Sequence, residues 1–267
     1  MEAETGMIAL QLYTLRDEMN KDVAATLHAV RSAGYETVET AFWPEHISLQ
    51  TARQLLREAG LSVCSSHCSL PADAKRPEMF EIAETFECSR VIWHGWPEDE
   101  RYKTEDGIKE LTDIYNETSQ RARTAGLKFG LHNHWWEFRN RVNGRMVYEI
   151  MLDHLDKDIF FELDTYWLKI AGHDPAKIIT DFGGRAPLLH IKDGPARWTD
   201  TLSTEHEPQV ALGKGSQDFP AILDAAREHV EWMVVEMDVC ATDTVIAVCE
   251  SYNYLSNLTA GRLHRQR

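Results

Sequence analysis

The sequence predicts an α/β fold, a single (β/α)8 TIM barrel in which residues 1–267 form one domain. Short apolar runs alternate with amphipathic stretches along the chain, which is typical of parallel strands covered by helices. The length of 267 residues suits one such barrel. An open doubly wound sheet is the alternative. It needs a glycine-rich turn after the first strand, and the segment QLYTLRD has no glycine.

Eight short runs rich in apolar and β-branched residues predict the strands. They are residues 7–13, 36–42, 61–67, 90–94, 128–134, 159–164, 186–191 and 232–237. Helices are expected at residues 21–33, 49–59, 105–125, 219–229 and 241–256. Gly34, Gly60 and Gly126 follow three of these helices, and glycine readily adopts the left-handed backbone that ends a helix. Residues 194–217 form a long polar connection of the kind that often serves as a lid or binding loop.

The composition, 43% hydrophobic and 27% charged, is that of an ordinary globular protein. A formal net charge of −15 argues against nucleic-acid partners, because proteins that bind nucleic acids usually have a basic surface. No apolar stretch approaches the roughly 20 residues that span a bilayer, so we expect no membrane partner. The acidic N-terminus is unlike a secretory signal, and five irregularly spaced cysteines do not form a disulfide framework. We therefore expect a cytoplasmic location.

Catalytic groups of a (β/α)8 barrel lie at the carboxyl ends of its strands, and the last four predicted strands end in metal-binding residue types. These residues are His132, His134 and Glu137 in KFGLHNHWWEF, Asp164 in IFFELD, His190 and Lys192 in APLLHIKD, and Glu236 in MVVEMD. Ionisable groups at the ends of buried strands are costly unless a metal or a partner holds them. We therefore expect these residues to converge on one site.

A metal centre is the preferred interpretation of this convergence. The predicted ligands are Glu137, Asp164, His190 and Glu236. Three carboxylates and one imidazole suit one divalent ion, with Mn²⁺ expected first and Mg²⁺, Co²⁺ or Zn²⁺ as alternatives. The competing interpretation is an ion-pair network with Lys192 and Arg185. His132 and His134 are two residues apart and therefore point to one face of a strand, which favours a site role over packing.

Other strand ends and loops supply candidate substrate contacts. They are Tyr13, Glu39, His67, His94, Trp167 and Lys214. Glu39 is equally well explained as a structural carboxylate paired with Arg16 or a backbone amide. Lys214 lies in a GKG segment before a helix, a place where barrels can bind phosphate. Because Asp218 is expected to cap that helix, an unphosphorylated substrate is favoured.

The segments HNHWWEF, ELDTYW and LHIKD, together with QLYTLRD, AGYETVE, AGHDPAKII, GKG and VVEMD, resemble the xylose isomerase-like TIM barrel superfamily of sugar phosphate isomerases and epimerases. The resemblance extends from about residue 7 to about residue 258. It implies one divalent metal held by Glu, Asp, His and Glu from strands five to eight. Asp164, His190 and Glu236 correspond to the last three. It also implies a homo-oligomer, a dimer or a tetramer.

The fifth strand departs from this pattern. Leu131 and His132 stand where ketose epimerases usually have the glutamate, and the first glutamate is Glu137. We expect Glu137 to reach the metal, with His132 or His134 in its place as the alternative.

The expected activity is that of a metal-dependent isomerase or epimerase acting on a keto-sugar through an enediolate. Glu236 would act as ligand and base, Glu137, His132 or His134 as further acid–base groups, and Lys192 would stabilise oxyanion charge. The first rival is a lyase, dehydratase or deglycosidase acting on a keto-inositol or 3-keto-glycoside. An AP-endonuclease-like enzyme would need a zinc cluster and a basic groove. A non-catalytic sugar-binding barrel would be expected to lose metal ligands.

Overall fold

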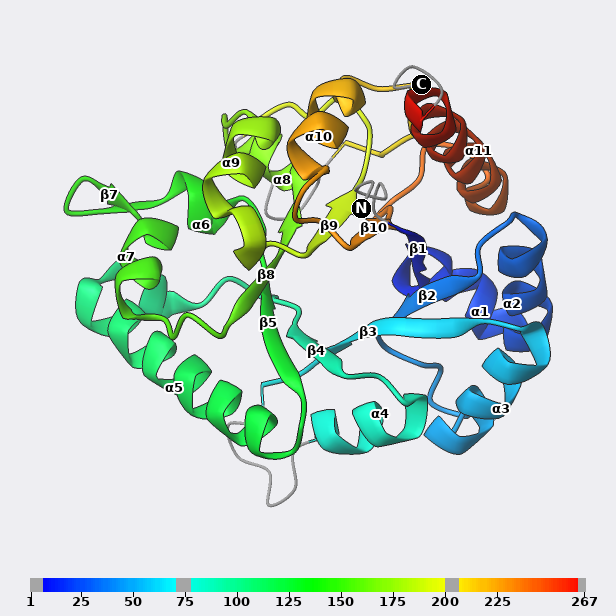
Figure 1. Cartoon of the computed structure of the whole chain (residues 1–267), viewed down its shortest axis with the longest axis horizontal. Helices are drawn as coiled ribbons and strands as arrows, with labels where there is room; N and C mark the ends of the chain where they lie inside the picture. The colour runs from blue at the N-terminus through cyan, green and yellow to red at the C-terminus, as the bar shows by residue number, and fades with distance from the viewer. Residues whose placement is uncertain (1–6, 71–77, 200–206, 264–267) are drawn as a thin grey trace.

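The computed structural model of this chain describes residues 7–70, 78–199 and 207–263. Eight parallel strands close into a barrel in the order β1-β10-β9-β8-β5-β4-β3-β2, which confirms the predicted fold (Figure 1). The barrel strands are β1 (Met7–Gln11), β2 (Thr37–Thr40), β3 (Ser62–Cys68), β4 (Arg90–Trp93), β5 (Lys128–His132), β8 (Phe160–Asp164), β9 (Leu188–Ile191) and β10 (Trp232–Val235). Each lies within its predicted range, except that β3 ends one residue later.

Helices surround the barrel (Figure 1). They are α1 (Arg16–Lys21), α2 (Val23–Ser32), α3 (Leu49–Ala59), α4 (Glu78–Phe86), α5 (Glu105–Thr124), α6 (Trp136–Arg139), α7 (Val147–His154), α8 (Thr165–Ile170), α9 (Pro175–Phe182), α10 (Phe219–Ala226) and α11 (Thr244–Leu263). The five predicted helices correspond to α2, α3, α5, α10 and α11. Gly60 ends α3 with a φ of 70°, as expected for a left-handed terminator. A small antiparallel hairpin, β6 (Arg141–Val142) with β7 (Arg145–Met146), follows α6.

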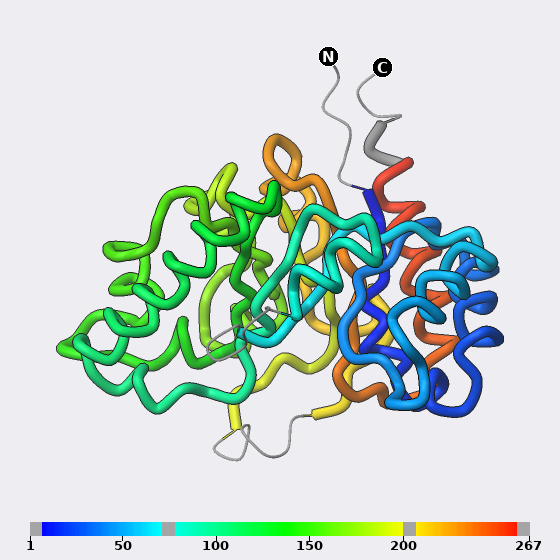
Figure 2. The backbone as a smooth tube through the Cα atoms, turned by 90° about the horizontal axis from the view of Figure 1, so that it is seen from below, coloured from blue at the N-terminus to red at the C-terminus, as the bar shows by residue number. Residues whose placement is uncertain are grey.

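The two halves of the chain meet where β1 pairs with β10, from Met7 opposite Trp232 to Leu10 opposite Val235. The C-terminal helix α11 consequently packs beside α2, as both views show (Figures 1 and 2). Among the described residues, no helix is long and apolar enough to cross a membrane. The five cysteines are free thiols, three of them buried.

An apolar layer closes the amino-terminal end of the barrel interior. Its side chains are Ala9, Cys64, Ile92, Phe160, Leu188 and Val234. Gly130 leaves room for the Phe160 ring, because a Cβ at Gly130 would lie 2.3 Å from it. Inward-facing positions recur every two residues along a strand, so the next positions form a second layer. That layer is polar and contains Gln11, His132, Glu162, His190 and Glu236. The change from apolar to polar places a closed floor under the candidate site.

Candidate functional site

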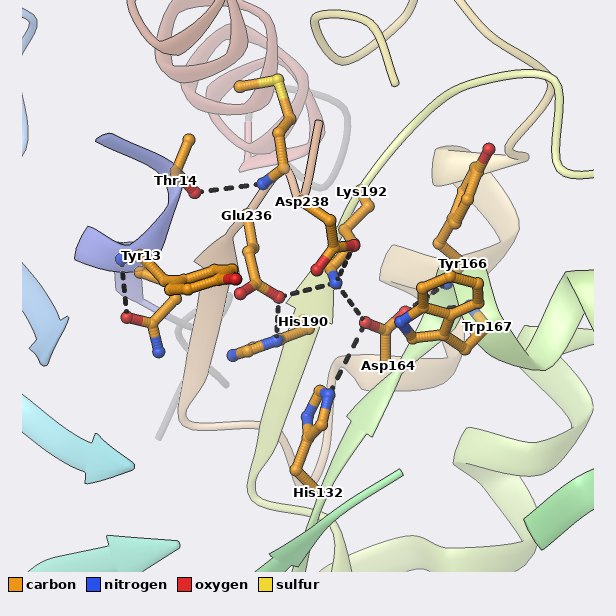
Figure 3. A network of polar contacts seen from close by, with 12 residues as sticks. Tyr13, Thr14, His132, Asp164, Tyr166, Trp167, His190, Lys192, Glu236 and Asp238 are labelled. Atoms are coloured by element: carbon orange, nitrogen blue, oxygen red, sulfur yellow. Dashed lines mark hydrogen bonds and ion pairs between the residues drawn. The ribbon is translucent and has the colours of Figure 1, made fainter. Parts of the chain in front are cut away.

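Three of the predicted metal ligands lie together at the carboxyl ends of β8, β9 and β10 (Figure 3). Asp164, His190 and Glu236 place one ligand atom each within 4.8 Å of the others, and all three are buried. The strand register sets Asp164 opposite His190. Glu236 Oε2 lies 2.7 Å from His190 Nδ1. The expectation that separate strand ends converge is therefore met for these three residues.

The two carboxylate oxygens of Asp164 have different partners. Asp164 Oδ1 caps α8 by accepting hydrogen bonds from the backbone N–H groups of Tyr166 and Trp167, both at 2.9 Å. Asp164 Oδ2 faces the other ligands. Burial raises the pKa of Asp164 to about 6, and this effect outweighs the opposing effect of the nearby Lys192 ammonium. The helix cap therefore fixes the carboxylate so that one oxygen remains directed at the site.

His132, at the end of β5, directs a ring nitrogen towards the same group of candidate ligands. Its Nε2 lies 3.9 Å from Asp164 Oδ2, and its Nδ1 lies 3.3 Å from Glu162 Oε2. Burial, with the positive charge of His190 as the next cause, lowers the pKa of His132 to about 3. A neutral imidazole is the form that binds metals. The alternative in which His132 replaces the usual fifth-strand glutamate thus agrees with the geometry.

Glu137 lies elsewhere, which corrects its prediction as a metal ligand and acid–base group. It belongs to α6, one turn beyond the strand, and its Oε2 accepts a hydrogen bond from the His134 backbone N–H at 3.0 Å. Glu137 lines a small separate cavity with Tyr102 and Tyr115. Burial raises its pKa to about 8. The helix turns this carboxylate back onto its own loop instead of into the barrel.

Lys192 provides the positive charge of the site. Its Nζ lies 2.9 Å from Asp164 Oδ2, 2.7 Å from Glu236 Oε2 and 2.8 Å from Asp238 Oδ2 (Figure 3). Part of the expected ion-pair network is therefore present. Arg185 does not join it, because its guanidinium donates to the backbone carbonyls of Asp156 and Ile159.

The donor set fits a divalent ion. Ligand atoms around one ion at about 2.1 Å lie roughly 3 to 4 Å apart, which is the scale of the spacings described above. Asp164 Oδ2 and His190 Nδ1 are buried and have no partner in hydrogen-bond geometry, although charged neighbours lie close. Two imidazole nitrogens and two carboxylate oxygens form a mixed set that suits Mn²⁺, Co²⁺ or Zn²⁺.

A cavity of about 250 Å³ adjoins the group of candidate ligands. Its lining includes Glu236 and His132 from that group, and also Tyr13, Arg16, His67, His94, His134, Trp167 and Asp238. All predicted substrate contacts except Glu39 and Lys214 therefore border one cavity. Trp167 is 4% exposed and faces the Lys192 ammonium 5.5 Å from its ring centroid. The cavity combines aromatic walls with a small set of polar groups, as small-molecule sites commonly do.

Glu39 lies outside that lining, which corrects its prediction as a substrate contact. It is fully buried and accepts hydrogen bonds from Gln11 Nε2 at 2.7 Å and Ser65 Oγ at 2.5 Å. His190 Nε2 lies 2.7 Å from its Oε1. It is a structural carboxylate, as the alternative held, but its partners are these side chains and not Arg16.

Lys214 also lies away from the cavity and forms an ion pair with Glu250 Oε2 at 2.6 Å. The surrounding GKG backbone binds a carboxylate of the chain itself. The N–H groups of Gly213 and Gly215 donate to Asp193 Oδ2 at 2.9 and 2.8 Å. Asp218 caps α10 as predicted, accepting from Ala221 N–H. An internal anion therefore occupies the amides that a phosphate would need. Residues 200–206 of the expected 194–217 loop lie outside the described residues.

Two residues of the site were missed from the sequence. Glu162 precedes Asp164 by two positions, and Asp238 follows Glu236 by two. Residues two apart share a face of a strand, so both could have been found by also considering the residues two positions before and two positions after each predicted ligand. Glu162 is fully buried beside three histidines, and Asp238 joins Lys192 and Gln209.

Comparisons with known proteins agree with this architecture. No curated protein matches the chain. A sugar phosphate isomerase/epimerase from Parabacteroides distasonis is similar in structure, with 24% identity, 94% of this chain and 93% of that chain covered, and a TM-score of 0.77. An L-ribulose 3-epimerase structure has 17% identity, coverage of 98% and 96%, and a TM-score of 0.71. A probable 3-DHS dehydratase from Bacillus anthracis has 11% identity, coverage of 93% and 98%, and a TM-score of 0.67.

These three likenesses show the fold. The model of one protein family, described as xylose isomerase-like TIM barrel, matches residues 27–244, which is most of the chain. The chain therefore belongs to the xylose isomerase-like TIM barrel family.

Proposed function

We propose that this protein is a divalent-metal-dependent sugar isomerase or epimerase that acts on a keto-sugar through an enediolate. The observation that carries the proposal is the group formed by Asp164, His190 and Glu236, with His132 Nε2 3.9 Å from Asp164 Oδ2, beside a cavity of about 250 Å³. The family membership and the fold shared with sugar isomerase and epimerase structures support it.

The ion would be held by His132 Nε2, Asp164 Oδ2, His190 Nδ1 and Glu236 Oε2. A bound divalent ion supplies Lewis-acid stabilisation of negative charge on the substrate carbonyl and the neighbouring hydroxyl. His132 takes the place first predicted for Glu137.

Two side chains that line the cavity can move the substrate protons. Glu236 is held ionised, because Lys192 and His190 keep its pKa well below the usual range despite burial. An ionised carboxylate can accept the proton from the carbon next to the carbonyl. Burial lowers the pKa of His134, so its imidazole is neutral and can exchange a proton as the complementary group. Delivery of a proton to the same carbon from the opposite face gives epimerisation, and delivery to the neighbouring carbon gives isomerisation.

Lys192 lies just behind the cavity lining and would stabilise negative charge on the substrate from there, through its contacts with Glu236 Oε2 and Asp238 Oδ2. Its anchor on Asp238 Oδ2 lies on the cavity side, because Asp238 lines the cavity. Gln209 Nε2 donates to the same Asp238 oxygen at 3.0 Å and holds that carboxylate in place. The ammonium is thus positioned in advance, which is how an electrostatic contribution to the transition state is made effective.

An unphosphorylated substrate fits the charges of the cavity. Arg16 is the one lysine or arginine among the described residues of its lining. Its guanidinium already donates to the backbone oxygens of Tyr13 and Asp238, at 3.0 and 2.6 Å. The GKG amides are bound to Asp193. The same acidic surroundings, with Glu236 and Asp238 in the wall, argue against DNA as substrate.

A lyase or deglycosidase acting on a 3-keto-glycoside is the second candidate, and the mouth of the cavity favours it. Phe42, Trp96 and Val239 line the cavity and are 59%, 49% and 42% exposed. Exposed apolar side chains around a polar site suit contact with a further group of the substrate. Loss of that group after proton abstraction would use the same metal and the same base.

Proton exchange tests the proposal. With Mn²⁺ in D₂O, we expect the wild-type protein to exchange the C–H next to the carbonyl of a keto-sugar, and Glu236→Gln to abolish this exchange. Release of a second sugar or alcohol from 3-keto-glycosides would assign the lyase instead. Absence of exchange across a panel of keto-sugars and keto-glycosides, with metal bound, would contradict the enediolate mechanism.

A further inference from the structure

Three imidazole nitrogens surround one oxygen of the buried Glu162. Glu162 Oε2 lies 2.7 Å from His67 Nε2, 3.0 Å from His190 Nε2 and 3.3 Å from His132 Nδ1. Glu162 is fully buried, and each of these histidines is at most 8% exposed. A carboxylate in such a place is costly unless it has a definite partner, so its role requires an explanation.

Two of these histidines are also the imidazoles of the proposed metal site, and they use opposite ring nitrogens for the two contacts. His132 directs Nδ1 to Glu162 and Nε2 towards Asp164. His190 directs Nε2 to Glu162 and Nδ1 to Glu236. One carboxylate oxygen thus touches the rear nitrogen of both rings, from the floor side of the site.

We propose that Glu162 is a positioning residue that fixes the tautomer and the ring orientation of both His132 and His190, so that His132 Nε2 and His190 Nδ1 together face one divalent ion. This inference rests on the proposed metal site. A neutral imidazole carries one N–H and one lone pair. In the structure His190 Nε2 forms its hydrogen bond with Glu39 Oε1 at 2.7 Å, and His132 Nδ1 lies 3.3 Å from Glu162 Oε2 without one. With an ion bound and both rings neutral, donation of both rear N–H groups to Glu162 would leave both lone pairs on the ion side. Carboxylates behind metal-binding histidines act in this way.

The inner set could itself be read as a metal site, since His67, His132, Glu162 and His190 also place ligand atoms within 4.8 Å of one another. The two sets compete because His190 belongs to both, and because His132, a member of the inner set, also has its Nε2 3.9 Å from Asp164 Oδ2. A neutral ring cannot give a lone pair to each side. Both sets have members in the cavity lining, Glu236 from the outer set and His67 and His132 from the inner one, so the ring tautomers tested below also distinguish the two sets.

Glu39 provides an internal comparison. Its Oε1 lies 2.7 Å from His190 Nε2 and 3.2 Å from His67 Nε2. Among the contacts described for Glu39, none is with His132. Loss of Glu162 should therefore affect both metal-facing rings, and loss of Glu39 should affect His190 alone.

Metal affinity is the first test. Metal-stripped wild type and Glu162→Gln are titrated with Mn²⁺ by calorimetry, and we expect one ion per chain, with affinity about 10- to 100-fold weaker in the variant. Glu137→Gln is the matched control, since it makes the same change at a buried glutamate outside both sets, and its affinity should equal that of wild type. If wild type binds no ion, the proposed function fails. If wild type binds and Glu162→Gln binds equally well, the positioning role fails while the metal site stands.

Imidazole ¹⁵N chemical shifts in the Zn²⁺-loaded protein give a readout that a merely structural role would not change. We expect protons on His132 Nδ1 and His190 Nε2 in wild type, mixed tautomers for both rings in Glu162→Gln, and a change at His190 alone in Glu39→Gln. Glu162→Asp should partly restore both shifts and supplies a second variant if the glutamine protein does not fold. Two ions per chain, or unchanged tautomers in the folded variants, would overturn the proposal.

Discussion

Lys192 Nζ lies 2.9 Å from Asp164 Oδ2, the oxygen that the α8 cap leaves directed at the proposed metal site. The side chains of Lys192 and Asp164 are 1% and 0% exposed. One ammonium thus balances carboxylates that would otherwise repel one another in a buried place. The proposed ion and Lys192 share these carboxylates, so the electrostatics of the site depend on both cations.

Replacement of Lys192 tests this shared role. Lys192→Met leaves Asp164, Glu236 and Asp238 without their ammonium partner, and breaking a buried charge network in this way typically costs about 3–5 kcal/mol. We expect the free energy of unfolding of the metal-free protein to fall by that order, and Mn²⁺ to restore more stability to the variant than it adds to wild type. Urea titrations with and without Mn²⁺ measure both effects.

Lys214→Met is the matched control for that experiment. Lys214 pairs with Glu250 on the surface, and both side chains are more than two-fifths exposed. Such pairs contribute about 0–1 kcal/mol. Equal stability losses in the two methionine variants would contradict the role given to Lys192.

Glu137 makes stability depend on pH. Burial raises its pKa in the folded protein to about 8 from an ordinary value of 4.5. Between these values the folded state binds more protons than the unfolded state, so its contribution to the free energy of unfolding falls as pH rises. As pH rises through this window, we expect the free energy of unfolding of Glu137→Gln to increase relative to that of wild type, by at most about 1.4 kcal/mol per pH unit. Urea titrations of both proteins at about pH 5 and pH 8 measure this change. If the difference in free energy of unfolding between variant and wild type is the same at both pH values, Glu137 does not have the proposed effect.

Asp193 holds the loop that follows β9. Its carboxylate accepts four backbone N–H groups, from Gly194, Gly213, Gly215 and Gln217, at 2.8 to 3.1 Å. Asp193→Asn turns an amide N–H₂ towards some of these donors. Hydrogen bonds to charged groups contribute about 1.5–3 kcal/mol each, so we expect a loss of at least 2 kcal/mol in the free energy of unfolding.

Limited proteolysis of the same variant gives a local measure. Cleavage within residues 207–217 should be faster in Asp193→Asn than in wild type. Asp218→Ala removes a helix cap worth about 1 kcal/mol in the same segment and serves as the comparison. A smaller effect for Asp193→Asn than for Asp218→Ala would contradict the role of this carboxylate.

The strands and the convergence of the three central candidate ligands were predictable because buried parallel strands read as apolar runs and barrel chemistry lies at their carboxyl ends. That logic placed Asp164, His190 and Glu236 together. It examined strand ends only, and therefore missed Glu162, which lies one inward-facing position deeper in β8.

The remaining errors arose where side-chain direction depends on loops and short helices. Glu137 follows the strand by a single turn of α6, whose orientation no periodicity reveals. Lys214 lies in a loop that folds around Asp193, and the partner of that loop is distant in sequence. Glu39 faces the barrel interior, as the alternation of strand residues predicts. Its burial away from the cavity lining depends on how the barrel closes, which the local sequence does not reveal.

Metal titration of wild type against Asp164→Asn tests the central claim most directly. Asparagine still caps α8 through Oδ1, so the fold of that region is retained, but it replaces the carboxylate charge at the site. The account predicts one Mn²⁺ per wild-type chain and loss of most of this affinity in the folded variant. Wild-type protein that binds no divalent ion, or an Asp164→Asn variant that binds as tightly as wild type, would contradict it.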